Sequence, residues 1–283
     1  MSAPCLPPEI LDHIVDRLHT SPEALKECCL VSKSWIPRTR QHLFANITFH
    51  TKERLGSWKK TFPEPSTSPG YYTKSLSIGC PYVVTTADAE PGGWITGFSR
   101  ATDLGVDNGM IFTDESATFL IPFHGFSPSL KSLHMSFTSL PASRTFDLIL
   151  SFPLLEDLKV TAYFASVDND HDPDILRLPP IRVVQPSANP PRLTGSLELL
   201  LSGRAELFAH WLCLLTNGIH FRKLTTTWNH GRDLSVTAAL VERCSHTLEA
   251  IQVTCIPPGR SFRDLRPRRQ LTSVRRQVDA GWA

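Results

Sequence analysis

Short strand-like runs recur along this chain at nearly even intervals. Five clear copies and three weaker ones carry apolar residues at fixed positions, as in Leu130, Leu133 and Met135. The middle residues of the eight runs are separated by 29, 28, 29, 25, 39, 27 and 27 residues. They are Ile47, Leu76, Leu104, Leu133, Leu158, Leu197, Leu224 and Ile251. Such a period indicates one unit repeated along the chain, with neighbouring units stacked to bury a shared core.

Helix-like runs lie between these strand-like runs, at 146–152, 205–215 and 234–243. The pattern of one strand and one helix per unit resembles the leucine-rich-repeat proteins, whose period is about 20 to 29 residues. That resemblance implies a curved solenoid with a parallel sheet along its inner face. The expected fold class is therefore α/β.

Two departures from the family pattern make the expected solenoid irregular. The 39-residue step contains 167–191, which is rich in Asp and Pro and indicates an inserted loop. The ninth position of a repeat is usually Asn or Cys in that family, and here only Asn229 fits. An ordinary open α/β sheet built of βα units would show the same alternation without a constant period, and it remains the alternative fold.

Three short amphipathic segments precede the first repeat. Apolar residues at helical spacing predict a helix from the prolines Pro7 and Pro8 to about His19. A second helix is predicted after the N-cap Ser21, and a third over 36–44. Helices this short are marginal alone because nucleation is costly, so they need to pack against each other and against a partner.

This N-terminal region resembles an F-box. The resemblance is carried by Leu6-Pro7-x-Glu9-Ile10-Leu11 and by Leu30-Val31-Ser32-Lys33-Ser34-Trp35, with Ser32 where many members have cysteine. Membership implies that the region binds the Skp-type adaptor of a cullin-RING ubiquitin ligase, while the rest of the chain selects a substrate protein. The positions that the resemblance assigns to the adaptor-facing surface, or to its support, are Leu6, Pro7, Ile10, Leu11, Ile14, Leu18, Leu30, Val31 and Trp35.

Composition narrows the class of protein further. With 41% hydrophobic residues and no apolar run near twenty, we expect neither a disordered nor a membrane-spanning chain. The seven scattered cysteines and the lack of a visible secretory signal predict a cytoplasmic or nuclear location. Residues 260–283 carry a net charge of +5 against −3 for residues 1–259. This favours a basic, disordered tail, with a nucleic-acid arm as the alternative.

Motifs for catalysis or cofactor binding are incomplete. The glycines of 91–97 lack the spacing of a phosphate-binding loop, so we expect a flexible surface turn rather than a nucleotide-using enzyme. The alternating acids of 168–174 lack the glycine and glutamate of an EF-hand. Cys244 and His246 are too few for a zinc site and are expected to pack at a helix end. The sequence therefore predicts no enzyme, no cofactor and no metal.

The chain is thus predicted to have three parts: an F-box-like helical domain in 1–45, a degenerate leucine-rich-repeat solenoid in 46–259, and the tail in 260–283. The expected function is protein–protein interaction, as a substrate-recruiting adaptor for protein ubiquitination by an SCF-type ligase. A repeat scaffold without ligase linkage is the alternative. A membrane partner is not expected, and neither is nucleic acid. By strand alternation, the substrate protein would face Lys131, His134, Lys159 and Thr225.

Overall fold

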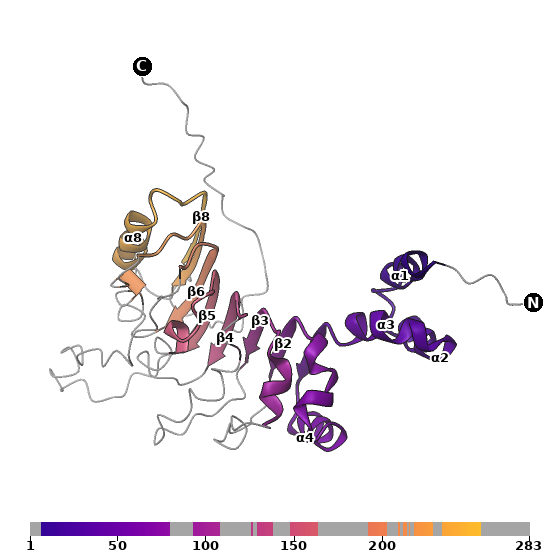
Figure 1. The fold of residues 1–283 in the computed structure, drawn as a ribbon. Coiled ribbons are helices and arrows are strands. Elements are labelled where there is room, and N and C mark those ends of the chain that lie inside the picture. Colours follow the sequence, from indigo (N-terminus) through magenta and orange to yellow (C-terminus); the bar gives the residue numbers. More distant parts are fainter. Residues whose placement is uncertain are drawn as a thin grey trace, which may run out of the picture.

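A computed structural model gives the fold of the chain (Figure 1). It describes residues 7–79, 93–107, 126, 129–137, 148–163, 192–202, 209, 212–213, 215, 218–228 and 234–255. The α-helices are α1 (Pro8–Arg17), α2 (Pro22–Val31), α3 (Ile36–Leu43), α4 (Lys52–Thr61) and α8 (Leu234–Arg243). The short 3-10 helices are η1 (Lys33–Trp35), η2 (Pro65–Thr67), η3 (Pro69–Tyr72) and η5 (Trp94–Phe98). The strands are β1 (Asn46–Phe49), β2 (Ser75–Ile78), β3 (Asp103–Val106), β4 (Ser132–Phe137), β5 (Asp157–Tyr163), β6 (Ser196–Ser202), β7 (Lys223–Trp228) and β8 (Ala250–Cys255).

The eight strands form one parallel sheet whose order follows the sequence from β1 to β8. Each strand pairs with the next one along the chain, and the eight predicted middle residues form a single row from Ile47 to Ile251. Helices α1 to α3 project from the β1 end of the sheet, and α8 lies near the β8 end (Figure 1). The chain is therefore a mixed α/β protein, and the predicted parallel sheet is confirmed.

A backbone hydrogen-bond motif recurs where the strands begin. The carbonyl oxygen of Ala45 accepts hydrogen bonds from the amides of Lys74 and Ser75, at 2.8 and 3.0 Å. Other carbonyls accept from two consecutive amides of the next unit in the same way, and they belong to Lys74, Thr102, Lys131, Gly195 and Arg222. The units are therefore equivalent in backbone geometry although their side chains differ.

A side chain replaces one of these backbone acceptors at the long step between β5 and β6. The amide of Gly195 donates to the carbonyl of Glu156, but the amide of Ser196 donates to Oδ1 of Asp157 at 2.6 Å. The Ser196 hydroxyl donates to the same oxygen at 2.7 Å. Asp157 thus fixes β6 beside β5. The predicted insertion at 167–191, with its acids, lies outside the described residues, as do Asn229 and the tail.

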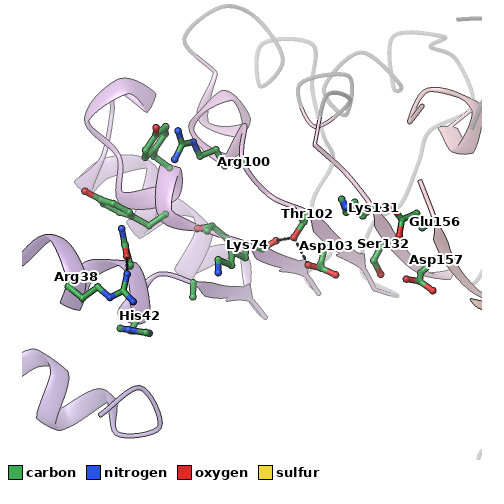
Figure 2. Close-up of a pocket in the computed structure, with 15 residues that line it drawn as sticks. Arg38, His42, Lys74, Arg100, Thr102, Asp103, Lys131, Ser132, Glu156 and Asp157 are labelled. Carbon is green, nitrogen blue, oxygen red and sulfur yellow. Dashed lines mark hydrogen bonds and ion pairs between the residues drawn. The ribbon is translucent and has the colours of Figure 1, made fainter. Parts of the chain in front are cut away.

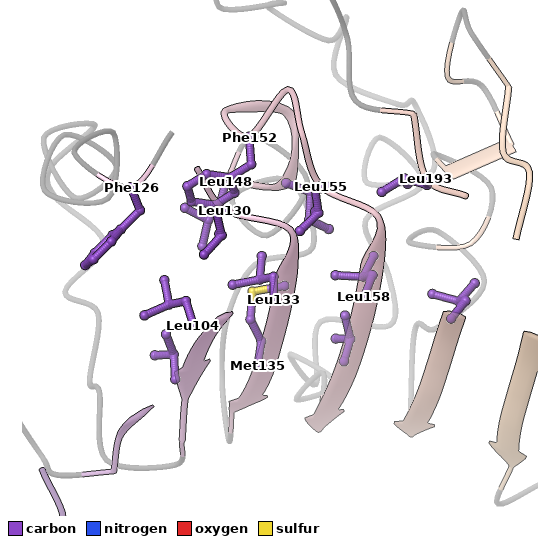
Figure 3. Packing of buried hydrophobic residues seen from close by; sticks show 14 of the residues in the cluster. Leu104, Phe126, Leu130, Leu133, Met135, Leu148, Phe152, Leu155, Leu158 and Leu193 are labelled. Atoms are coloured by element: carbon purple, nitrogen blue, oxygen red, sulfur yellow. The ribbon is translucent and has the colours of Figure 1, made fainter. Parts of the chain in front are cut away.

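The hydrophobic core covers one face of the sheet (Figure 3). Strand residues such as Leu133, Met135 and Leu158 are buried on that face, and Phe126 and Phe152 from the connecting segments are buried against it. A parallel sheet with apolar side chains must be covered by other segments to exclude water from those side chains. Each fully buried large side chain contributes about 1.5–3 kcal/mol.

The connecting segments match the sequence predictions in part. Helix α8 covers the predicted run at 234–243, and 148–150 is helical within the run at 146–152. Most of the run at 205–215 lies outside the described residues.

Residues 93–97, the part of the glycine-containing segment 91–97 that the structure describes, correct a prediction. Its spacing predicts a flexible surface turn, but η5 buries Trp94, Ile95, Gly97 and Phe98 in the core. The ring of Phe98 packs against those of Phe49 and Trp58. These aromatic contacts join segments that are far apart in the sequence, and they keep η5 buried in the hydrophobic core.

Candidate protein-binding surfaces

Helix α1 exposes apolar side chains at its predicted binding positions. Pro7 is the N-cap residue and Pro8 is the first helical residue. The C-cap residue is Leu18, one residue before His19, where the sequence predicts that the helix ends. Val15 is buried within the protein, whereas Ile10 is 49% and Ile14 38% exposed. The apolar face predicted from the sequence is therefore only partly covered.

Helix α2 exposes the two apolar residues at its C-terminal end. Its N-cap is Ser21, whose hydroxyl accepts a hydrogen bond from the Ala24 amide, as the sequence predicts. Leu25 is buried, but Leu30 is 88% and Val31 67% exposed. Helices α1 and α2 thus each carry two exposed large apolar side chains.

Helices α1 and α3 are joined by a cluster of polar side chains. Nε of Arg38 donates to Oδ1 of Asp16 at 2.6 Å, and Nη2 donates to Oδ2 at 2.7 Å. Nε2 of His42 lies 2.8 Å from the same Oδ1. These hydrogen bonds hold the pKa of the Asp16 carboxyl far below its usual range, with the Arg38 hydrogen bond as the largest cause. A two-point arginine–carboxylate pair of this kind fixes orientation as well as distance.

The structure places eight of the nine predicted binding residues, and Leu6 lies outside the described residues. Pro7, Ile10, Ile14, Leu30 and Val31 are exposed. Leu11, Leu18 and Trp35 are half-buried, and so support the exposed positions more than they present surface. All eight belong to α1, to α2 and η1, or to the residues that cap them.

A polar groove of about 780 Å³ runs along the edge of the sheet where the strands begin (Figure 2). Most of its charged groups already have partners: Arg38 binds Asp16, Nζ of Lys131 lies 3.5 Å from Oε1 of Glu156, and Arg100 stacks on the ring of Tyr71 at 3.9 Å. The sequence reasoning did not identify this groove. Three of its charged residues each lie immediately before a strand: Lys74, Lys131 and Glu156. This repeated position is the feature of the sequence that indicates the groove.

The second face of the sheet carries polar side chains. His134, Lys159 and Glu198 occupy strand positions that alternate with the buried residues, and they are neighbours across β4, β5 and β6. Nζ of Lys159 lies 2.8 Å from Oε1 of Glu198. Burial, and then the Lys159 charge, lower the pKa of His134. The predicted substrate-facing residues His134 and Lys159 thus belong to one polar cluster, with Thr225 next in the row. Lys131 lines the polar groove instead.

Four cysteines in the described part of the chain are free thiols. No group of three or more His, Cys, Asp or Glu side chains there could hold a metal ion. The thiols of Cys28, Cys213 and Cys244 are free, and burial raises the pKa of each. Cys244 packs just after α8, with Sγ 3.7 Å from the carbonyl oxygen of Ile219, whereas His246 is exposed. These cysteines are packed as small protonated side chains.

No helix in the described ranges is long and apolar enough to cross a membrane. Comparison with known proteins found no family model that matches this chain and no match among curated proteins.

Proposed function

We propose that this protein is a substrate-recruiting adaptor of a cullin-RING, SCF-type ubiquitin ligase. Its F-box-like helices bind a Skp-type adaptor, and its repeats bind a target protein. The role requires no chemistry in this chain, because holding target and ligase together raises their effective concentration. Such ligases act in the cytoplasm and nucleus, where a chain with free thiols is stable.

The observation that carries this proposal is the exposure of apolar side chains on α1 and α2. Ile10, Ile14, Leu30 and Val31 occupy positions that the F-box resemblance assigns to the adaptor. Helix α1 is joined to α3 by the Asp16–Arg38 pair, and α2, with its buried Leu25, also packs against α3. Two helices that pack against a common third helix and keep apolar residues uncovered are suited to bind another subunit.

We also propose that the repeats form an irregular leucine-rich-repeat solenoid. The sequential strand order supports this, since a doubly wound sheet reverses its strand order at a switch point. The recurring hydrogen bonds at Ala45, Lys74 and the equivalent carbonyls support it as well. In this arrangement the polar cluster of His134, Lys159 and Glu198 faces the target.

The test is a pull-down with purified Skp-type adaptor. Ile14→Asp and Leu30→Asp place a charge on the exposed apolar positions, where the fold should tolerate it. Each should weaken adaptor binding by about tenfold or more, because a buried unpaired carboxylate is costly at an interface. Leu154→Asp is the matched control: this leucine is 50% exposed but lies just before β5, and its replacement should leave binding unchanged.

Two results would contradict the proposal that α1 and α2 bind the Skp-type adaptor. One is a wild-type chain that does not bind the Skp-type adaptor at all, which would favour a repeat scaffold without ligase linkage. The other is undiminished binding by both aspartate variants, which would show that α1 and α2 are not the contact. Circular dichroism on each variant verifies that the helices remain folded.

A further inference from the structure

Apolar contacts hold helix α1 along one side only. Val15 is the only buried residue of α1, all of whose residues the structure describes, and Leu11 and the C-cap residue Leu18 are half-buried. Helix α2, by contrast, buries both Leu25 and Cys28. The hydrophobic effect is non-directional, so packing of this kind keeps α1 close to its neighbours but defines its rotation less sharply than hydrogen bonds do.

Directional contacts to α1 come from α3 and meet at Asp16. Nε and Nη2 of Arg38 donate to the two carboxylate oxygens of Asp16, at 2.6 and 2.7 Å. The guanidinium is itself held on α3, because Nη1 donates to Oε1 of Gln41 at 3.1 Å. Nε2 of His42 lies 2.8 Å from Oδ1 of Asp16. Two side chains of α3 therefore converge on one carboxylate of α1.

Asp16 lies on the side of α1 opposite to the exposed isoleucines. Successive residues of an α-helix are rotated by about 100°, so Asp16 is about 200° from Ile14 around the helix axis. Ile10 is one turn before Ile14, on the same side. Asp16 therefore faces α3, while Ile10 and Ile14 remain exposed. A rotation of α1 that breaks the Asp16–Arg38 pair also turns both isoleucines, because one helix carries all three residues.

We infer that Asp16 and Arg38 are positioning residues for adaptor binding: their pair sets the rotation of α1 that presents Ile10 and Ile14 to the Skp-type adaptor. The inference rests on the proposed function, and it adds two residues that the F-box resemblance does not assign. Neither residue needs to touch the adaptor. Without the pair, only a fraction of the molecules holds α1 in the binding orientation, and the apparent Kd rises by the inverse of that fraction.

A double-mutant cycle tests the inference by calorimetric titration of the full chain with purified Skp-type adaptor. Asp16→Ala and Arg38→Ala should each weaken binding by about tenfold. The double variant should bind no more weakly than either single variant, because the two residues act through one pair. Asp12→Ala, the same change one turn earlier on α1 at an exposed position, is the matched control and should leave the Kd unchanged.

Each possible result has a distinct meaning. A wild-type chain that does not bind the adaptor would overturn both the proposed function and this inference. If the wild-type chain binds, unchanged affinity of the single variants would overturn the inference alone. Losses that add in the double variant would do so too, because they would show independent contacts with the adaptor.

A milder variant separates positioning from stability. Circular dichroism at the assay temperature shows whether each variant keeps its helices. Arg38→Lys keeps the positive charge but loses the two-point geometry, so it should bind the adaptor severalfold more weakly with an unchanged helical signal. If an alanine variant unfolds, this comparison decides the question. Binding by Arg38→Lys equal to that of the wild-type chain would then overturn the inference.

Discussion

Asp16 shows how a single carboxylate can set the arrangement of two helices. It accepts hydrogen bonds from Arg38 on α3 and lies beside His42 on the same helix. The pair is partly exposed to solvent, so its main effect is to fix the angle between the helices. Spacing within the sequence gives no sign of this contact, because Asp16 and Arg38 are 22 residues apart.

Asp16→Asn should therefore lower the thermal unfolding midpoint, and the effect should depend on pH. Because the pKa of Asp16 is lowered in the folded state, its contribution is fully present above the unfolded value of about 4 and is lost as the pH falls through the folded value. Melting curves by circular dichroism from pH 7 to pH 2 should show the two proteins converging in acid. Asp12→Asn, one turn earlier on α1, is the control. A pH-independent difference would be inconsistent with this account.

At the scale of elements, the sequence predicted strands well and long-range contacts poorly. The row from Ile47 to Ile251 was predicted because strand side chains alternate with a fixed period, and that period survives in the sequence. Helix α1 was predicted from its prolines and apolar spacing. The burial of η5 and the Asp16–Arg38 pair depend on segments that meet only in the folded chain, so no local pattern encodes them.

The exposure of the predicted binding residues could be predicted from the sequence only in part. Periodicity identified the apolar face of α1, but it could not show that Val15 is buried while Ile14 remains partly exposed. Helix α3 and the short helix η1 both contact α1, and the helical period does not give their positions.

The link between β5 and β6 gives a prediction at the same scale. Asp157→Ala removes two hydrogen bonds to Ser196 and should lower the free energy of unfolding by about 1–3 kcal/mol. Gly195→Ala should cost a similar amount, because a Cβ there collides with Oδ1 of Asp157. In the Asp157→Ala background the Gly195→Ala cost should mostly disappear. Urea denaturation of the single and double variants measures this, and strictly additive effects would contradict the shared contact.

The whole molecule is a row of units, each paired with its neighbours in the sequence. Within the described residues, strands such as β4 and β5 are paired on both sides, whereas β1 and β8 are paired on one. Protection of the backbone from solvent should therefore vary along the row.

Hydrogen–deuterium exchange followed by mass spectrometry measures this variation. We expect the outward amides of Asn46 and Thr48 to exchange on the order of tenfold or more faster than the amides of Leu133 and Leu158. Equal protection of β1 and β4 would mean that another segment covers the outer edge of β1.

The strand order also has a consequence for synthesis. Every strand after β1 pairs with the strand made just before it, so a chain leaving the ribosome can extend its sheet one strand at a time. Pairing partners are separated by only a few dozen residues, which keeps the entropy of closing each connection small. Each strand therefore finds its pairing partner already synthesised when it leaves the ribosome.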